Sequence, residues 1–194
     1  MTGTDWIWER GGEKIRHPLA LADLVGEQLV AALGPACRRI MVAGSVRRRR
    51  PDVGDIEILL VPKIITEKDM FGQVVASHSE PNRVLMEMGF ERGILRPNGA
   101  WGPYNKRLFH IPSGIPVDVF TASMENWGRD LLVRTGPADF NIKVMSRFRQ
   151  LGCRGHAYGD AAVTLKDGSS RFAPDEETMF GLLGWDYLEP EARK

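Results

Sequence analysis

The chain has 194 residues, and its 26 lysines and arginines nearly balance its 25 aspartates and glutamates, giving a formal net charge of +1. A hydrophobic fraction of 43% and a charged fraction of 26% are typical of a globular protein and exclude a disordered, collagenous or coiled-coil chain. The near-neutral charge also argues against a protein that coats nucleic acid by charge alone.

The sequence pattern suggests neither a secretory signal nor a membrane span. The first residues contain no apolar signal region, and no apolar stretch is long enough to suggest a membrane span. The two cysteines, Cys37 and Cys153, have neither the spacing of a disulfide framework nor that of a zinc site. We therefore expect reduced thiols and a cytoplasmic protein with no membrane partner.

In the first two thirds of the chain, hydrophobic spacing predicts alternating helices and strands. Leucines and valines three and four residues apart indicate an amphipathic helix, whereas short apolar or alternating runs indicate strands. The predicted elements are a strand or ordered arm over the first fifteen residues, a helix over 19–33, strands over 39–43 and 55–61, a helix over 68–88 interrupted near Pro81, and antiparallel strands over 107–111 and 115–121.

The sequence changes character near 127–136, where we place a boundary. After it, a helix over 140–150 is followed by a glycine-rich stretch with short strands at 157–158 and 162–165 and a last helix over 175–183. We predict two domains, 1–126 and 127–194, the second being a small lobe packed on the first. The fold class expected is α+β.

The segment 43–60 carries the clearest chemistry. Gly44-Ser45 follows a predicted strand and favours a tight turn, with Ser45 capping a short helix. The N–H groups of a helix N-terminus attract anions, so this turn is suited to phosphate. The run Arg47–Arg50 adds guanidinium groups that bind phosphate through two hydrogen bonds each.

Three carboxylates are expected beside that turn. Asp55 and Glu57 are two residues apart, so on a strand their side chains share one face. Asp118 is a lone charge in an apolar strand and is the natural third member. Such oxygen ligands suit Mg²⁺, and three of them can hold the two ions that catalyse in-line phosphoryl or nucleotidyl transfer.

This arrangement resembles the signature of the X family of DNA polymerases, whose best-known member is polymerase beta. The family pattern of Gly-Ser-x-Arg-Arg, a short linker, Gly-Asp-x-Asp and two apolar residues is matched by Gly44, Ser45, Arg47, Arg48, Gly54, Asp55, Glu57, Leu59 and Leu60. The resemblance implies a palm built of a mixed or antiparallel sheet with flanking helices, plus a small C-terminal α+β lobe. It assigns the metals, two Mg²⁺ with Mn²⁺ as an option, to Asp55, Glu57 and Asp118, and the triphosphate to Gly44, Ser45, Arg48 and Gly54.

Two later segments extend the resemblance to about 16–193. Thr135-Gly136 and Phe140-Asn141 are similar to the family element that approaches the sugar and base of the incoming nucleotide, and 175–193 is similar to its C-terminal helix and Pro-x-x-Arg tail. The chain departs from the family pattern at Glu57, where the polymerases have aspartate, at Val133-Arg134 in place of an aromatic pair, and at Met145 in place of an arginine.

A basic helix face is the expected nucleic-acid contact. Lys143, Arg147 and Arg149 follow Phe140-Asn141 on the predicted helix, where they would track a duplex backbone. The expected partners are a dNTP, with an rNTP left open, and gapped or primer-template DNA, acted on by a monomer. The leading hypothesis is a repair-type DNA-directed DNA polymerase that adds dNMP to a primer 3′-OH.

Two alternative functions stay open. One is a template-independent nucleotidyltransferase acting on RNA, a small molecule or a protein, which differs only in its acceptor. The other is a nucleotide- or DNA-binding module without turnover, for which Glu57 is the single favourable feature.

Overall fold

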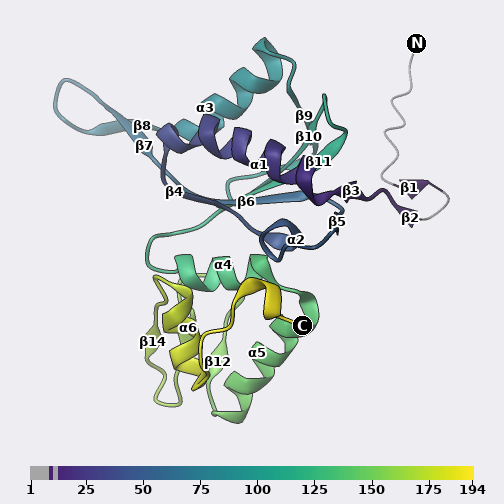
Figure 1. Ribbon diagram of the computed structural model, residues 1–194. Coiled ribbons are helices and arrows are strands. Elements are labelled where there is room, and N and C mark those ends of the chain that lie inside the picture. The colour runs from purple at the N-terminus through teal and green to yellow at the C-terminus, as the bar shows by residue number, and fades with distance from the viewer. Residues whose placement is uncertain (1–8, 11–12) are drawn as a thin grey trace.

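The computed structural model describes residues 9–10 and 13–194, so Trp6 and Trp8 of the predicted arm lie outside the described residues. The fold is α+β, as predicted, with a sheet and its covering helices in one half and a mainly helical lobe in the other (Figure 1). The helices are α1 Leu19–Leu33, α2 Gly44–Arg47, α3 Glu80–Met86, α4 Trp127–Thr135, α5 Ala138–Gln150 and α6 Glu176–Leu183, with single helical turns η1 Gly34–Ala36, η2 Glu87–Glu91 and η3 Pro190–Ala192.

The central sheet has five strands in the order β4-β6-β11-β10-β9. Its pairs are antiparallel except for β6 and β11, which run parallel and form its centre. Its strands are β4 Cys37–Val42, β6 Ile56–Pro62, β9 Leu95–Trp101, β10 Asn105–His110 and β11 Ile115–Thr121. The predicted strands over 39–43, 55–61, 107–111 and 115–121 are therefore confirmed within a few residues, while β9 was not predicted.

Short two- and three-stranded ladders surround the sheet. β3 His17–Pro18 pairs with β5 Asp52–Val53, and this brings the start of the chain beside the segment that enters β6. The remaining short strands are β1 Glu9–Arg10, β2 Glu13–Lys14, β12 Arg154–Gly155, β13 Val163–Thr164 and β14 Ser170–Arg171. The predicted strand at 157–158 is wrong, because the chain pairs earlier, at Arg154–Gly155.

The predicted helix over 68–88 is wrong in its first half. Residues 64–79 form a hairpin of β7 Ile64–Lys68 and β8 Val74–Ser79, which projects from the sheet (Figure 1). The turn is built by Asp69, whose side chain accepts hydrogen bonds from the backbone N–H groups of Phe71 and Gln73. Pro81 does not interrupt a helix but lies in the first turn of α3, where its missing N–H leaves no hydrogen bond unmade.

One face of the sheet packs against α1, which spans Leu19–Leu33 as predicted. Val25, Leu29 and Leu33 of this helix are buried against Ile56 and Ile58 of β6. By length and composition the stretch Leu19–Ala36 could cross a membrane, with a mean hydropathy of 1.3, and 33% of it is buried in the fold, on the face that packs on the sheet.

The other face of the sheet meets the lobe through a smaller core. Leu59 and Phe120, two residues beyond Glu57 and Asp118 on their strands, pack with Trp127 and Leu131 of α4. Within the lobe, α4 crosses α6 so closely that a Cβ on Gly128 would stand 1.8 Å from the carbonyl oxygen of Asp175, and only glycine permits this approach. The lobe core is formed by α5, α6 and the short strands.

Candidate active site

Glu57 and Asp118 are brought together by the register of the two central strands. In the parallel pair β6 and β11, Asp118 lies directly opposite Glu57, so both side chains leave the same face of the sheet. Asp55 precedes β6 by one residue and projects on that side too. The topology therefore gathers the three predicted acids where the sheet meets the lobe.

The environment of Glu57 identifies it as the most perturbed acid of this group. Burial raises the pKa of Glu57 to about 7, and the charges of Asp55 and Asp118 add to the effect, while Arg134 and Arg48 oppose it. In the described part of the chain, no three or more histidine, cysteine or acidic side chains are already gathered tightly enough to hold a metal ion.

Gly44 makes room for the Glu57 carboxylate. Its backbone has φ of 64°, and a Cβ built on it would lie 2.6 Å from Oε2 of Glu57. The glycine of the motif is thus required twice, by its backbone conformation and by the close approach of the acid. Ser45 is not the helix cap that the sequence predicted, because α2 begins at Gly44 with Ala43 as its N-cap and no side-chain cap bond.

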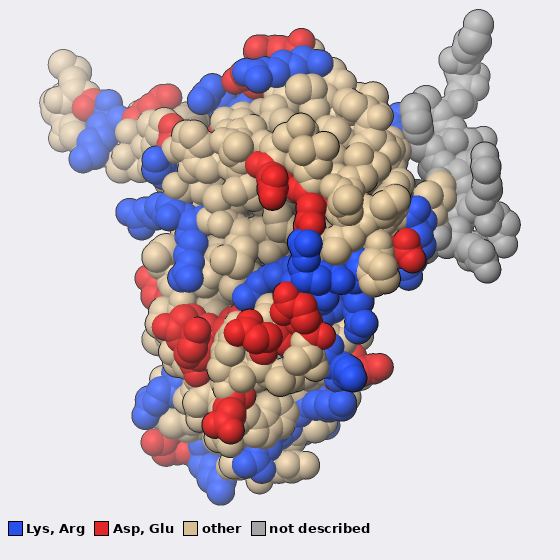
Figure 2. All heavy atoms as spheres, viewed as in Figure 1, with Lys and Arg blue, Asp and Glu red and all other residues tan. Residues whose placement is uncertain are grey.

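Arginines lie near the acids, and Figure 2 shows lysine and arginine side chains gathered across the waist of the molecule near α2. Arg48 lies close enough to Glu57 and Asp55 to feel their charges, although burial and Arg50 together lower the pKa of its guanidinium. Arg16, placed by the β3–β5 ladder, has a guanidinium nitrogen 3.6 Å from where a Cβ of Gly54 would lie. Both cations are therefore available to an anion beside the carboxylates.

Arg47, by contrast, is used to hold the two halves of the molecule together. It donates to both carboxylate oxygens of Glu176 at 2.9 and 2.7 Å and to the hydroxyl of Thr135 at 2.7 Å. Glu176 also accepts from Arg193 at 2.6 Å, and both of these side chains are buried. Although burial alone would raise it, the hydrogen bonds from Arg47 and Arg193 lower the pKa of Glu176. We call Arg47, Glu176 and Arg193 the interlobe triad.

Most of the residues predicted to form the sugar and base pocket are buried or hydrogen-bonded within the protein. The Thr135 carbonyl accepts from Arg48 and its hydroxyl from Arg47, so this buried residue joins α2 to the lobe. Phe140 is buried in the lobe core, with ring centroids 6.2 Å from Phe180 and 6.4 Å from Trp185. Asn141 donates to the carbonyl of Val133 at 2.8 Å, while its Oδ1 has no hydrogen-bond partner.

The three cations predicted to face DNA differ in whether they already have hydrogen-bond partners within the protein. Arg147 donates to the carbonyl of Leu183 at 3.0 Å and so links α5 to the end of α6. Lys143 donates to the carbonyl of Lys194 at 3.0 Å. Arg149 is exposed, and among residues 9–10 and 13–194 it makes a long 3.5 Å contact with the carbonyl of Met145 in its own helix.

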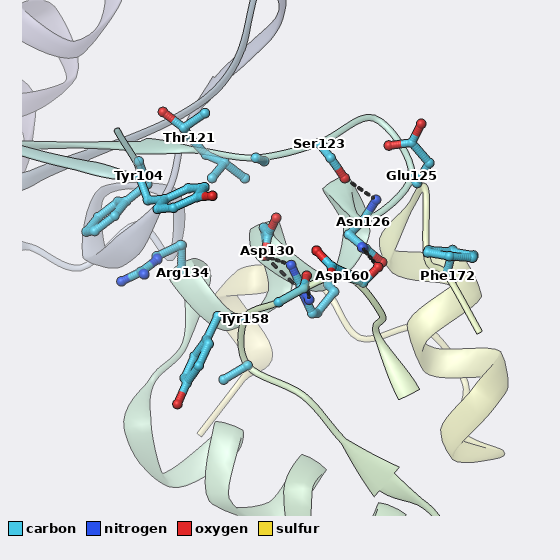
Figure 3. Close-up of a pocket in the computed structure, with 16 residues that line it drawn as sticks. Tyr104, Thr121, Ser123, Glu125, Asn126, Asp130, Arg134, Tyr158, Asp160 and Phe172 are labelled. Carbon is cyan, nitrogen blue, oxygen red and sulfur yellow. Dashed lines mark hydrogen bonds and ion pairs between the residues drawn. The ribbon is translucent and has the colours of Figure 1, made fainter. Parts of the chain in front are cut away.

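A cleft of about 810 Å³ lies between sheet and lobe, and it is lined by Leu59 and Phe120, two residues beyond Glu57 and Asp118 on their strands, rather than by the acids themselves. Arg134 of α4 lies in it with its guanidinium 3.6 Å from the centroid of the Phe120 ring. In Figure 3 it stands between Tyr104, from the turn before β10, and Tyr158, from the loop after β12. Arg134 therefore connects the cleft with Glu57, whose negative form its charge stabilises.

Some of these residues were not identified from the sequence. Glu176 and its bonds to Arg47 and Arg193 were missed, although the Pro-x-x-Arg tail that carries Arg193 was noticed. Arg107, whose Nε is 3.7 Å from Asp118, was missed because its importance depends on strand register.

This arrangement, a mixed sheet followed by a small, mainly helical lobe, is a polymerase beta-like fold. The chain is similar to the solved structure of Leishmania infantum polymerase beta in a ternary P/T complex. The match has a TM-score of 0.69 at 19% sequence identity and covers 93% of this chain and 77% of that one. No protein-family model and no curated protein matches the sequence.

Proposed function

We propose that the protein is an X-family DNA polymerase of the polymerase beta kind, transferring a nucleoside monophosphate from a dNTP to the 3′-OH of a DNA strand. The observation that carries the proposal is the placement of Glu57 directly opposite Asp118, with Arg48 beside the acids. Carboxylates on one side and guanidinium groups on the other are what a metal-bound triphosphate requires. The fold shared with a polymerase beta seen in a ternary P/T complex supports this acceptor over the alternatives.

Asp55, Glu57 and Asp118 are the residues that would hold the divalent ions. Glu57, whose pKa is raised by burial and then by two other carboxylates, and which has space beside Gly44, fits such a role. Bound Mg²⁺ or Mn²⁺ would supply charge neutralisation of the phosphates and a more acidic acceptor hydroxyl.

The remaining residues bind and orient the nucleotide. Arg48 and Arg16 would contact the triphosphate, and the unused Oδ1 of Asn141 is an acceptor for the sugar or base. In the reaction, the acceptor oxygen forms a bond to the α-phosphorus while the bond to the pyrophosphate oxygen breaks on the opposite side. The hydroxyl proton passes to solvent or a carboxylate, and the pyrophosphate leaves beside the arginines.

Primer extension with labelled dNTPs on one-nucleotide gaps tests the proposal. We expect incorporation by the wild type and a loss of at least about a hundredfold in Asp118→Ala, because transition-state charge stabilisation is commonly worth that much. Glu27→Gln, an exposed change on the far side of α1, should leave the rate unchanged. Equal rates in wild type and Asp118→Ala would contradict the mechanism.

Substrate choice is settled by the same assay with changed reagents. Correct copying of each template base supports a templated polymerase, and incorporation that ignores the template supports the template-independent alternative. Parallel reactions with rNTPs test sugar choice, since Val133 and Arg134 stand where the resembled family has an aromatic pair. Mg²⁺-dependent dNTP binding without pyrophosphate release would instead support a module without turnover.

A further inference from the structure

The hairpin of β7 and β8 exposes an unusual amount of apolar surface. Met70 at its tip is 90% exposed, the highest value for a large hydrophobic side chain in the described part of the chain, and Phe71 beside it is 81% exposed. The two strands form a sheet of their own, and residues 63–75 are exposed apart from Asp69. The further exposed apolar side chains of the hairpin are Ile64, Ile65, Val74 and Val75. A contiguous exposed apolar surface of this kind marks an interaction site.

The tip of the hairpin is held in one conformation by hydrogen bonds. The Asp69 carboxylate accepts from the backbone N–H groups of Phe71 and Gln73, both at 2.9 Å. The backbone N–H of Asp69 donates to the carbonyl of Gln73 at 2.9 Å, and that of Gly72, with φ of 79°, donates to the carbonyl of Asp69 at 3.0 Å. A tip that is already ordered loses less conformational entropy on binding, so it is suited to insertion into a partner.

An apolar groove of about 220 Å³ lies between η2 and the strands β9 and β10. The buried side chains of Leu95 and Leu108 line it from the two strands, and the exposed side chains of Phe90 and Trp101 line it from η2 and the end of β9. An apolar cavity of about 150 Å³ accommodates a benzene molecule. The groove therefore has room for one phenyl ring.

The backbone helps to set the shape of this groove. Gly89 of η2 packs so closely on β9 that an added Cβ would lie 3.2 Å from the carbonyl oxygen of Leu95. η2 is a π-helical turn, and such turns are rare but frequent at functional sites. The groove is thus a feature of the fold as well as of side-chain rotamers.

The charges of the tip and of the groove are complementary. The segment 92–110, which contributes β9 and β10, contains four basic residues and no acidic one, and its Arg96 lines the groove. Glu87 of η2 is paired with Arg83 and Arg92. The hairpin 64–79 has two acidic residues, both beside the tip, against a single lysine. Opposite charges around an apolar contact favour association and fix its orientation.

The tip and the groove of one molecule lie far from each other. β9 is the outer strand at one edge of the sheet, whereas the hairpin continues from β6 and projects on the opposite side of the sheet in Figure 1. The tip of one molecule therefore reaches the groove of another copy and not its own.

We propose that the protein self-associates by inserting the Phe71 ring of one copy into the groove between η2 and β9 of a second copy. Because the two surfaces differ, the contact is heterologous, and it closes into a pair when two copies exchange tips or into a ring when more do. The proposal departs from the monomer expected from the sequence.

This contact leaves the acid site open. Leu108 lies opposite Val117 in the core beneath α1, so the groove is on the α1 face of the sheet, while Asp118 points to the other face. The inference therefore stands apart from the proposed function, and a failure of either one says nothing about the other.

The test is sedimentation velocity of the full chain over a range of concentrations. The wild type should associate as concentration rises, and Phe71→Ser and Phe90→Glu should each raise the dissociation constant by at least about tenfold, because burying a phenylalanine ring is worth that much. Tyr158→Ser, which removes a ring that is 82% exposed, is the matched control and should associate as the wild type does. All three positions are exposed, so equal melting temperatures should confirm that the variants fold.

A mixture of the two variants identifies the contact. Phe71→Ser keeps an intact groove and Phe90→Glu keeps an intact tip, so an equimolar mixture should form a complex at concentrations where each variant alone is a monomer. The proposal is overturned if the wild type stays a monomer, if Phe90→Glu associates as the wild type does, or if the mixture fails to associate.

Discussion

Two clusters of charge meet at α2, one through Arg47 and the other through the approach of Glu57 to Gly44, and they are built on opposite principles. In the interlobe triad, Glu176 is matched by two arginines, every carboxylate oxygen is hydrogen-bonded, and the pKa of the acid is lowered. At the acid site, Glu57 faces two further carboxylates and its pKa is raised to about 7. A satisfied cluster stabilises the fold, whereas an unbalanced one stores free energy that a cation can release.

The largest effect should come from breaking the triad. Glu176→Ala leaves two arginines buried or half-buried without their partner, and removing one member of a buried ion pair costs about 3–5 kcal/mol of unfolding free energy. Urea denaturation followed by circular dichroism measures this loss. Glu177→Ala, at the adjacent exposed position, is the control and should change stability by no more than about 0.5 kcal/mol. Similar losses in both variants would contradict the structural role of the triad.

Neutralising Glu57 should raise the free energy of unfolding, whereas breaking the triad should lower it. Because its folded pKa is raised above the ordinary value of 4.5, the folded state binds more protons than the unfolded state between about pH 4.5 and pH 7. The stability of the metal-free wild type should therefore fall as pH rises through that window, by about 3 kcal/mol in total. Glu57→Gln should lose this dependence and be the more stable protein at pH 8, while losing nucleotide incorporation.

Denaturation in EDTA at pH 5 and at pH 8 measures that difference. Glu27→Gln, an exposed change of the same kind, should follow the wild type at both values. If Glu57→Gln were less stable than the wild type at pH 8, the charge of Glu57 would be balanced by favourable interactions in the folded protein. The acid site would then not differ from the triad.

Replacing Gly44 by a larger residue should lower the free energy of unfolding by a smaller amount. Gly44→Ala places a Cβ against Oε2 of Glu57 and a non-glycine residue at φ of 64°, and the backbone conformation alone costs about 1–2 kcal/mol. Gly93→Ala is the matched control, because Gly93 has nearly the same φ, 62°, and nothing within 4 Å of its added Cβ. We expect both variants to lose stability and only Gly44→Ala to lose incorporation. Equal activity in both would show that Glu57 can move without consequence.

Adding Mg²⁺ should stabilise the protein through the acid site and not through the triad. A ligand that binds only the folded protein at ten times its Kd adds about 1.4 kcal/mol to stability. Because binding needs the deprotonated carboxylate, the rise in melting temperature on adding Mg²⁺ should be larger at pH 8 than at pH 6 and absent in Glu57→Gln. Glu177→Ala should keep the full rise. An equal rise in Glu57→Gln would place the ion elsewhere.

The same contrast explains what the sequence could and could not predict. Local patterns were sufficient for α1, whose apolar residues recur with the helical period, and for the pairing of Asp55 with Glu57, which follows from strand geometry. The part of the hairpin from 68 to 79 was mistaken for helix because its exposed apolar residues lack a buried face to set a period of two. The triad and Arg107 depend on contacts between residues as many as 129 positions apart, or on strand register, and no local pattern carries either. The division into 1–126 and 127–194 stays a prediction.

The smallest stability effect is expected on α5, where the contrast reappears between two cations of one helix. Arg147 is satisfied by the carbonyl of Leu183, so Arg147→Ala should cost about 1 kcal/mol, the usual worth of such a bond. Arg149 is exposed with only a long contact to its own helix, so Arg149→Ala should change stability by less than about 0.5 kcal/mol. If Arg149 serves a DNA backbone, its loss should instead reduce the salt slope of DNA binding by about one. Anisotropy titrations of both variants decide this, because a purely structural pair would give Arg149→Ala the slope of the wild type.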